Sequence, residues 1–321
     1  MQSLTLTQDA NLPSTLAIVA DKARDYVKAS TAENTKRAYQ VAWADFARWC
    51  QDNGQDALPA SPVTVGLYLT QAADSLKVST LRLRLAAISQ AHKTAGYRLE
   101  TSAPEVRKVM SGIARTKGVA VSKKDAITDA ILRDAVRAYA TGSSLKAKRD
   151  RAILTVGFFA ALRRSELAAI NLEDVSFTDE GAIITLSRRK TDQEGQGTDI
   201  GLPIKPDTII CPVDALRSWI DAAGITEGAL FRSISKSDRL LEPRLGDKDV
   251  ARIIKSATQS AGYNSESFGG HSLRSGFITT CARKGVPERI IANQSGHKSI
   301  NVLRGYVRKA GVFQENAAAL I

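Results

Sequence analysis

The stretch HKSINVLRGYVR, residues 297–308, holds one of the three histidines of the chain and a tyrosine nine residues later. If this stretch were one straight helix, nine residues would move Tyr306 about 13.5 Å along the axis and turn it away from His297. Both side chains can serve one site only if the chain bends or a helix restarts between them. Gly305 gives the backbone that freedom. Taken alone, the pattern favours a tyrosine packed on a helix.

Two other stretches place basic residues beside apolar ones. In HSLRSGF, residues 271–277, His271 and Arg274 are three apart and share a helix face. A guanidinium fork beside an imidazole suits an oxyanion, and the stretch lacks the second ligand that a metal needs. Taken alone, the two residues could equally form a pair on the protein surface. In ALRRSELAAI, residues 161–170, adjacent arginines follow an apolar run. They either complement the end of the preceding helix or point into a site.

Composition limits the class of partner. The chain has 45 Lys and Arg against 33 Asp and Glu, a net charge of +12, which favours nucleic acid or an acidic membrane surface. The longest apolar run, AILTVGFFAAL, is too short to span a bilayer, and no basic amphipathic helix shows a broad apolar face. Three scattered cysteines indicate a reducing compartment. We therefore expect a soluble intracellular protein without a signal peptide.

Apolar spacing of three and four residues predicts a mainly helical chain in two domains. The expected helices are 14–30, 33–52, 62–74, 79–95 and 103–116 in the first half, and 128–140, 145–161, 164–170, 212–223, 247–261, 272–284 and 287–294 in the second. The alternating segments GAIITLSRRK and TDIGLPI predict a small β-hairpin. Residues 1–13 are expected to be flexible, 14–117 an all-helical domain, 118–127 a basic linker, and 128–321 a mostly helical domain with a small antiparallel sheet.

These motifs occur together in the order LRRSEL, RRK, HSLR, SGH and GYVR. In that order and spacing the chain resembles the tyrosine site-specific recombinase (phage integrase) family, and ENTKRAYQVAWADFARWC extends the likeness to its Cre-like members. The resemblance implies a helical core-binding domain joined to a catalytic domain of the DNA breaking-rejoining fold. It implies an enzyme that cuts and rejoins DNA through a 3′-phosphotyrosyl intermediate, without metal, ATP or other cofactor.

The resemblance also assigns roles to residues. Tyr306 becomes the nucleophile, and Arg163 and Arg274 clamp the phosphate oxygens with a hydrogen bond from His297. His271 is the expected base or proton relay. Lys190 is the expected general acid, although Arg188 or Arg189 could share its role. Glu166 is expected to anchor Arg163 rather than to take part in the chemistry. This division agrees with the physical need to stabilise the extra negative charge of a five-coordinate phosphorus.

DNA contacts are predicted by charge and by the family's layout. The candidates are Lys36, Arg37, Arg82, Arg84 and Lys93 in the first domain, and Arg244, Lys248, Arg252 and Lys255 in the second. Most such contacts go to phosphates and carry no sequence information.

The resemblance implies double-stranded DNA with inverted-repeat arms around a short spacer. It also implies a homotetramer on two such sites, formed from protomers that are monomeric or weakly associated when free. A short helix over 312–321 is expected to dock on a neighbouring catalytic domain, with docking on its own domain as the alternative. The cellular setting would be bacterial cytoplasm, acting on nucleoid, plasmid or phage DNA. The remaining alternatives are a type IB topoisomerase, a telomere-resolving nicking-closing enzyme, and a catalytically idle DNA-binding protein.

Overall fold

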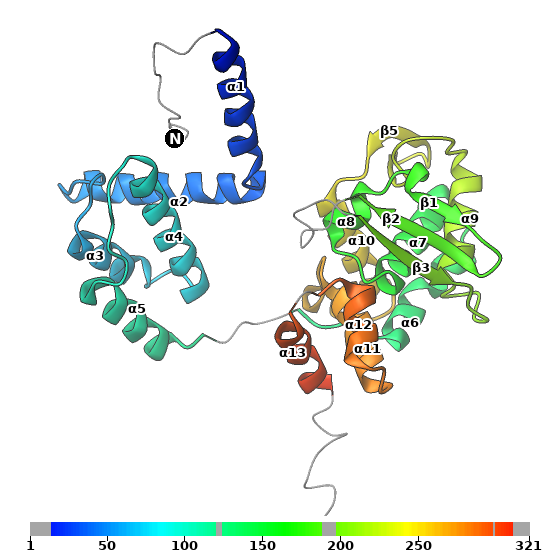
Figure 1. The fold of residues 1–321 in the computed structure, drawn as a ribbon. Coiled ribbons are helices and arrows are strands. Elements are labelled where there is room, and N and C mark those ends of the chain that lie inside the picture. The colour runs from blue at the N-terminus through cyan, green and yellow to red at the C-terminus, as the bar shows by residue number, and fades with distance from the viewer. Residues whose placement is uncertain (1–13, 120–123, 188–196, 298, 311–321) are drawn as a thin grey trace, which may run out of the picture. The chain divides into compact units, whose positions relative to one another are not determined.

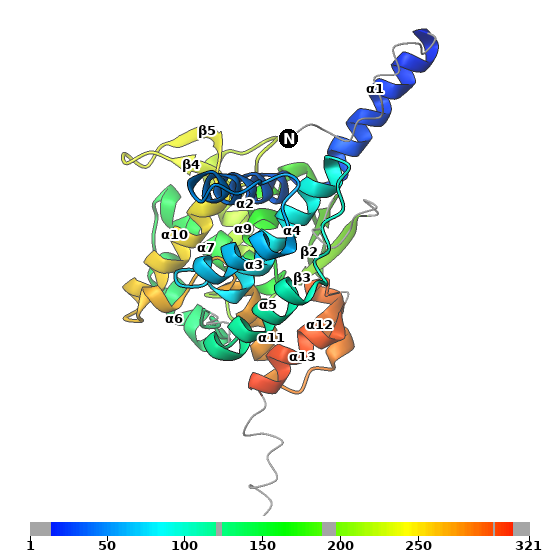
Figure 2. The same cartoon turned by 90° about the vertical axis from the view of Figure 1, so that its left-hand side faces the viewer.

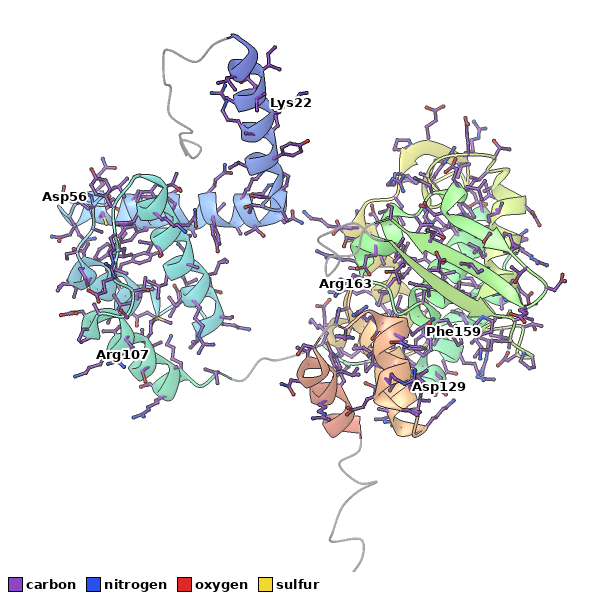
Figure 3. All side chains as sticks on the ribbon, viewed as in Figure 1. Lys22, Asp56, Arg107, Asp129, Phe159 and Arg163 are labelled. Carbon is purple, nitrogen blue, oxygen red and sulfur yellow. The ribbon has the colours of Figure 1, made fainter. Side chains whose placement is uncertain are left out.

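The computed structural model describes residues 14–119, 124–187, 197–297 and 299–310. The chain separates into two compact units, Met1–Ser122 and Lys123–Ile321. Figure 1 shows both units coloured from blue at the N-terminus to red at the C-terminus, with most helices and strands labelled. Figure 3 shows the side chains that fill the interior of each unit.

The described part of the first unit is helical, as its amphipathic pattern predicts. Its elements are α1 (Ser14–Ala29), α2 (Glu33–Asp52), α3 (Pro62–Ala72), α4 (Val78–Thr94) and α5 (Pro104–Lys117). Helix α2 packs on α4, and α3 packs on α5. Phe46, Leu69 and Leu81 are fully buried between them. Helix α3 begins at a capped turn, where the Ser61 hydroxyl accepts the Thr64 N–H at 3.0 Å.

The second unit combines helices with two small sheets. Its elements are α6 (Asp129–Ala140), α7 (Leu145–Phe159), α8 (Arg164–Ala169), η1 (Leu172–Asp174), β1 (Val175–Phe177), β2 (Gly181–Leu186), β3 (Thr198–Pro203), α9 (Pro212–Ala223), β4 (Arg232–Ile234), β5 (Leu240–Arg244), α10 (Asp247–Ser260), η2 (Ser265–Ser267), α11 (Ser272–Arg283), α12 (Glu288–Ser295) and α13 (Ile300–Ala310). The mainly helical fold with a small antiparallel sheet is confirmed.

The predicted hairpin is formed by β2 and β3. They pair antiparallel from Gly181 opposite Pro203 to Leu186 opposite Thr198. Alternate residues of β2 point into the core, which explains the alternation in the sequence. Two features were not predicted: β1 adds a third strand beside β2, and β4 pairs with β5 in a separate two-stranded sheet.

Helix α7 forms the centre of the second unit and leads to its candidate site. It packs on α6, α9 and α11, and its residues 152–158 are buried. The helix ends at Phe159, two residues earlier than predicted, because Ala161 adopts a left-handed φ of 50°. That conformation is costly for a residue with a Cβ atom, and it turns the chain sharply before Arg163.

Helices α11, α12 and α13 enclose a smaller apolar cluster of their own. Figures 1 and 2 both show these three helices together at one edge of the unit. Ile278, Ile291 and Leu303 are almost completely buried in the cluster, and Tyr306 packs against it. The cluster therefore fixes the helix that carries Tyr306.

Part of the predicted linker belongs to the second unit. The N–H groups of Asp125 and Ile127 donate to the carbonyls of Ser267 and Ser272, at 2.7 and 3.0 Å. Ile127 is fully buried. Residues 125–127 are thus held against α11, although their basic and polar sequence neighbours suggested a solvated connection.

Gly276 on α11 makes that close approach possible. A Cβ atom at this position would lie 1.7 Å from the carbonyl oxygen of Ile127. Because such a distance is impossible, a larger residue must displace the segment that leads into α6. By contrast, a Cβ atom at Gly305 on α13 would meet nothing within 4 Å.

We expect Gly276→Ala to lower the free energy of unfolding by about 1–3 kcal/mol or more, as overpacking does. Gly305→Ala is the matched control within the same unit, and it should leave stability unchanged or raise it by up to about 1 kcal/mol. Calorimetric melting of both variants measures the difference. An unchanged melting temperature for Gly276→Ala would contradict the packing described here.

Candidate active site

Four stretches of the second unit meet around Tyr306. They are the start of α11 with His271 and Arg274, the turn between α7 and α8, the connection between α12 and α13 with His297, and α13 itself. The Tyr306 hydroxyl and His271 Nε2 are 2.9 Å apart. The Tyr306 ring centroid lies 6.2 Å from that of His297. Five residues predicted from separate motifs are brought to this region: Arg163, His271, Arg274, His297 and Tyr306.

The chain between His297 and Tyr306 is not one helix. Helix α12 ends at Ser295, Gly296 adopts the left-handed φ of 63°, and α13 begins at Ile300. The expected interruption is confirmed, but its expected position at Gly305 is wrong, because Gly305 lies inside α13. The break before Ile300 lets one face of α13 carry Leu303 into the core and Tyr306 towards His271.

Arg274 is the most deeply buried charge at this site, with 1% of its surface exposed. One guanidinium nitrogen, Nη1, donates to the carbonyl of Ala161 at 2.6 Å. The other, Nη2, lies 3.3 and 3.4 Å from the two ring nitrogens of His297. A buried guanidinium bound to a carbonyl and a histidine keeps its charge available to an anion such as a phosphate.

Arg163 is held in place by Glu166. The backbone N–H of Arg163 donates to one carboxylate oxygen at 2.9 Å, and its Nη1 donates to the other at 2.5 Å. Glu166 itself is buried. The neighbouring Arg164 instead pairs with Asp247 at 3.1 Å. These contacts favour Arg163 over Arg164 as the site residue and fit Glu166 as its anchor.

Burial raises the pKa of Tyr306 above its ordinary value, and the positive charges of Arg274 and Arg163 oppose that rise. The phenol is therefore protonated at neutral pH, since its ordinary pKa is already about 10. To act as a nucleophile it must transfer its proton, and His271 Nε2 lies within hydrogen-bond distance. His271 is exposed, so the proton can pass on to water.

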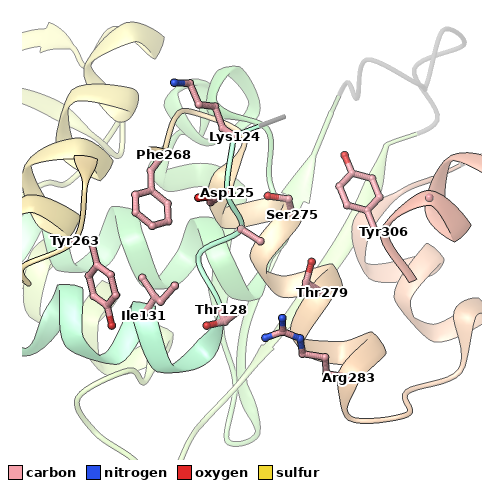
Figure 4. Close-up of a pocket in the computed structure, with 12 residues that line it drawn as sticks. Lys124, Asp125, Thr128, Ile131, Tyr263, Phe268, Ser275, Thr279, Arg283 and Tyr306 are labelled. Carbon is pink, nitrogen blue, oxygen red and sulfur yellow. The ribbon is translucent and has the colours of Figure 1, made fainter. Parts of the chain in front are cut away.

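Figure 4 shows Tyr306 at one side of a pocket of about 460 Å³ beside α11. Ser275, Thr279 and Arg283 project from α11, and Lys124, Tyr263 and Phe268 also line the pocket. Tyr306 lines this pocket, whereas the other four residues brought together at the site do not.

Some predicted residues fall outside the part of the chain that the structure describes. Lys190 lies there, together with Arg188 and Arg189 in the connection between β2 and β3. The expected helix over 312–321 also lies there. Their roles remain predictions.

The candidate DNA contacts of the first unit differ in their surroundings. Arg37, Arg82 and Lys93 are exposed, and Lys36 pairs with Glu33 at 2.5 Å. Arg84 is mostly buried, donates to the Tyr68 hydroxyl at 2.7 Å and forms an ion pair with Asp45. The guanidinium of Arg84 is thus paired with groups of the first unit itself.

The candidate DNA contacts of the second unit also include both exposed residues and residues that are bonded within the unit. Lys248 and Arg252 are exposed on α10, although Arg252 pairs with Asp249, and Lys255 pairs with Glu266 at 2.8 Å. Arg244 donates to the carbonyls of Ala168 and Ile170 at 2.9 and 3.0 Å. These bonds fasten the end of α8, the helix that begins after Arg163.

Two contacts of the site have no distinctive sequence signal. They are the Ala161 carbonyl that accepts from Arg274 and the Ser295 hydroxyl, 2.7 Å from His297 Nδ1. Backbone carbonyls and single serines occur everywhere, so only the fold reveals them. Within the described ranges no group of three potential metal ligands occurs, and no helix is long and apolar enough to cross a membrane.

Comparison with known proteins identifies the relatives of this chain. Residues 130–311 match the model of the phage integrase family. An integrase/recombinase xerD homolog of Selenomonas ruminantium is 38% identical over 92% of this chain and 87% of its own length. The recombinase cre of Escherichia phage P1 is 26% identical over 94% of both. A lambda integrase tetramer bound to a Holliday junction is similar in fold, with a TM-score of 0.53, 14% identity, and coverage of 94% of this chain and 74% of that one.

We expect His271→Gln to slow covalent attachment to DNA by about 10²- to 10⁴-fold, the usual contribution of a general base. Because the Tyr306 pKa is raised, the remaining rate should depend on spontaneous ionisation of the phenol. It should then climb about tenfold per pH unit up to at least about pH 10. Single-turnover rates measured across pH test this expectation. A His271→Gln profile parallel to that of the wild type would contradict the base role.

Proposed function

The chain belongs to the phage integrase family and is a tyrosine recombinase, and we propose that it exchanges DNA strands between two target sites using Tyr306 as its nucleophile. The observation that supports this assignment best is the pairing of the Tyr306 hydroxyl with His271 beside the buried Arg274. A phenol next to a proton acceptor and a buried guanidinium is suited to attack a phosphodiester.

In the proposed cleavage step, the Tyr306 oxygen attacks phosphorus while its proton passes to His271. The bond to the 5′ oxygen breaks, which leaves a 3′-phosphotyrosyl link and a free 5′ hydroxyl. Lys190 is the proposed donor of the proton to that leaving oxygen. Arg163, Arg274 and His297 stabilise the added negative charge on the non-bridging oxygens.

Rejoining is the same step in reverse, with a 5′ hydroxyl from a partner strand as the attacking group. One phosphodiester is exchanged for one phosphotyrosyl bond and then back again, so the bond energy is conserved. The reaction therefore needs no ATP, and the charge of the arginines replaces that of a metal ion. Glu166 acts only through Arg163, whose guanidinium it holds in position.

Basic residues of both units are the proposed DNA contacts. Arg37, Arg82 and Lys93 are exposed in the first, and Lys248 in the second. Lys36, Arg252 and Lys255 have acidic partners at the surface, which a DNA phosphate could displace. Arg84 and Arg244 bind groups within their own units, and their contact with DNA stays a prediction. The DNA is expected to carry inverted-repeat arms around a short spacer.

We further propose a homotetramer on two such sites, with residues 312–321 docked on a neighbouring catalytic domain. The fold similarity to a tetrameric lambda integrase on a Holliday junction supports the assembly. The segment carries the apolar residues Phe313, Leu320 and Ile321, which docking on a neighbouring catalytic domain would bury. The setting would be bacterial cytoplasm, with nucleoid, plasmid or phage DNA as the substrate.

The target site has to be found first, by selecting bound fragments from genomic DNA. With two copies of that site, the wild type should recombine DNA in EDTA without ATP. Tyr306→Phe should bind with unchanged affinity but form no adduct and no recombinant. Relaxation of supercoils without exchange between the sites would instead indicate a topoisomerase, and binding without any adduct by the wild type would indicate an idle DNA-binding protein.

Deleting residues 313–321 tests the assembly separately. We expect single-site binding and adduct formation on one site to remain, because the described catalytic residues lie outside the deleted segment. Pairing of two sites and the yield of recombinants should fall. Gel mobility of one-site and two-site complexes measures both effects, and full recombination by the shortened chain would exclude docking in trans as a requirement.

A further inference from the structure

Ser295 is a fully buried serine at the last position of α12, two residues before His297. Its hydroxyl oxygen lies 2.6 Å from the carbonyl oxygen of Ile291 and 2.7 Å from Nδ1 of His297. Both distances are short for hydrogen bonds, so the hydroxyl joins the backbone of α12 to the imidazole in a continuous chain of bonds.

The position of the protons in this chain follows from the chemistry of its members. A carbonyl oxygen only accepts, so the hydroxyl proton of Ser295 must lie between its oxygen and that of Ile291. With that proton committed, the Ser295 oxygen can only accept from the imidazole. Nδ1 of His297 must therefore carry a proton, and in the neutral ring the lone pair belongs to Nε2.

We propose that Ser295 is a positioning residue that holds His297 in its Nδ1-protonated form and presents Nε2 as the nitrogen that forms the hydrogen bond to the substrate phosphate. The role in catalysis rests on the proposed function, whereas the tautomer is a property of the free protein. Ser295 itself touches neither the phosphate nor Tyr306 in this scheme and acts through the imidazole.

The charged groups around His297 are consistent with that arrangement. Arg274 from α11 is the nearest. Its Nη2 lies 3.3 Å from Nδ1 and 3.4 Å from Nε2, and a ring with its lone pair on Nε2 accepts from Nη2 at that nitrogen. Tyr306 from α13 lies beside the ring, with His271 bonded to its hydroxyl. The positive charge of Arg163, from the α7–α8 turn, also acts on Tyr306.

An entering phosphate changes the protonation state that the surroundings of His297 favour. Its negative charge favours the imidazolium form, in which Nε2 takes up a proton from water and uses it to donate a hydrogen bond to a non-bridging oxygen. The Nδ1 proton stays on the ring and remains hydrogen-bonded to the Ser295 oxygen in both states, so the ring does not have to rotate or change tautomer. The helix backbone, through Ser295, thereby prepares His297 for the transition state.

The direct test is nitrogen NMR of the full-length protein with labelled histidine. The chain has only three histidines, and His92 supplies an internal standard. His92 is fully buried, its Nε2 accepts the Ala60 N–H at 2.8 Å, and its Nδ1 lies 2.8 Å from the Ile88 carbonyl, so it must be Nδ1-protonated. In the neutral ring, His297 should show the same nitrogen pattern as His92.

Two variants separate this role from simple packing. Ser295→Ala removes the acceptor and should release His297 into a mixture of tautomers. It should also lower the rate of adduct formation by about 10- to 100-fold, as expected for a bond to a charged group, with unchanged DNA affinity. Thr258→Val is the control, because Thr258 is equally buried and its hydroxyl donates to the Ile254 carbonyl at 3.0 Å without touching a histidine.

Thr258→Val should destabilise the fold without changing the His297 resonances or the cleavage rate. A proton on Nε2 of neutral His297 in the wild type would overturn the proposal. An unchanged His297 pattern in Ser295→Ala, or a rate equal to that of Thr258→Val, would do the same. If the tautomer is as proposed and Tyr306 forms no adduct with any DNA, the proposed function fails while the role of Ser295 in setting the tautomer stands.

Discussion

The arrangement of this site depends on the burial of one charge, the guanidinium of Arg274. Moving a cation out of water is costly unless hydrogen bonds and an opposite charge compensate for it. Part of the compensation comes from the Ala161 carbonyl at 2.6 Å. In the proposed function an incoming phosphate adds an opposite charge, so the anionic substrate binds beside a guanidinium that is already out of water.

The surrounding structure can be understood as the support for that charge. The left-handed turn at Ala161 ends α7, directs a carbonyl at Arg274 and leads directly to Arg163. Gly276 lets the chain before α6 press against the helix that carries Arg274. The interruption after α12 brings His297 to one side of the guanidinium, while Leu303 anchors α13 so that Tyr306 faces His271. Tyr306 is thus both a packed aromatic and the candidate nucleophile.

Much of this could be predicted from the sequence, because its signals are local. Most helices begin and end within two residues of their predicted positions, since amphipathic spacing and capped turns such as Ser61 are encoded locally. Strands β1, β4 and β5 are too short to show an alternating pattern in the sequence. They can be recognised only from their backbone pairing, β1 with β2 and β4 with β5. Helix geometry predicts an interruption between His297 and Tyr306. Its position could not be predicted, because the chain leaves the helix at Gly296 while Gly305 stays inside α13, where Leu303 and Tyr306 pack against the apolar cluster.

The partners of charged residues could not be predicted, because sequence gives a charge without its neighbours. Arg84 and Arg82 are two positions apart, yet one is tied to Asp45 and Tyr68 and the other is exposed. Arg244 likewise proves to bind backbone carbonyls. Ser295 resembles many other serines until its burial and its bond to His297 are known.

The most direct test of the account is to identify the amino acid that becomes linked to DNA. A nicked target site, from which the short 5′-hydroxyl fragment diffuses away, should trap the covalent intermediate with the wild-type protein. Protease digestion and mass spectrometry should then find the 3′ phosphate on the peptide that contains Tyr306. Attachment through another residue, or to a 5′ phosphate, would contradict the assignment of the nucleophile and the direction of the reaction.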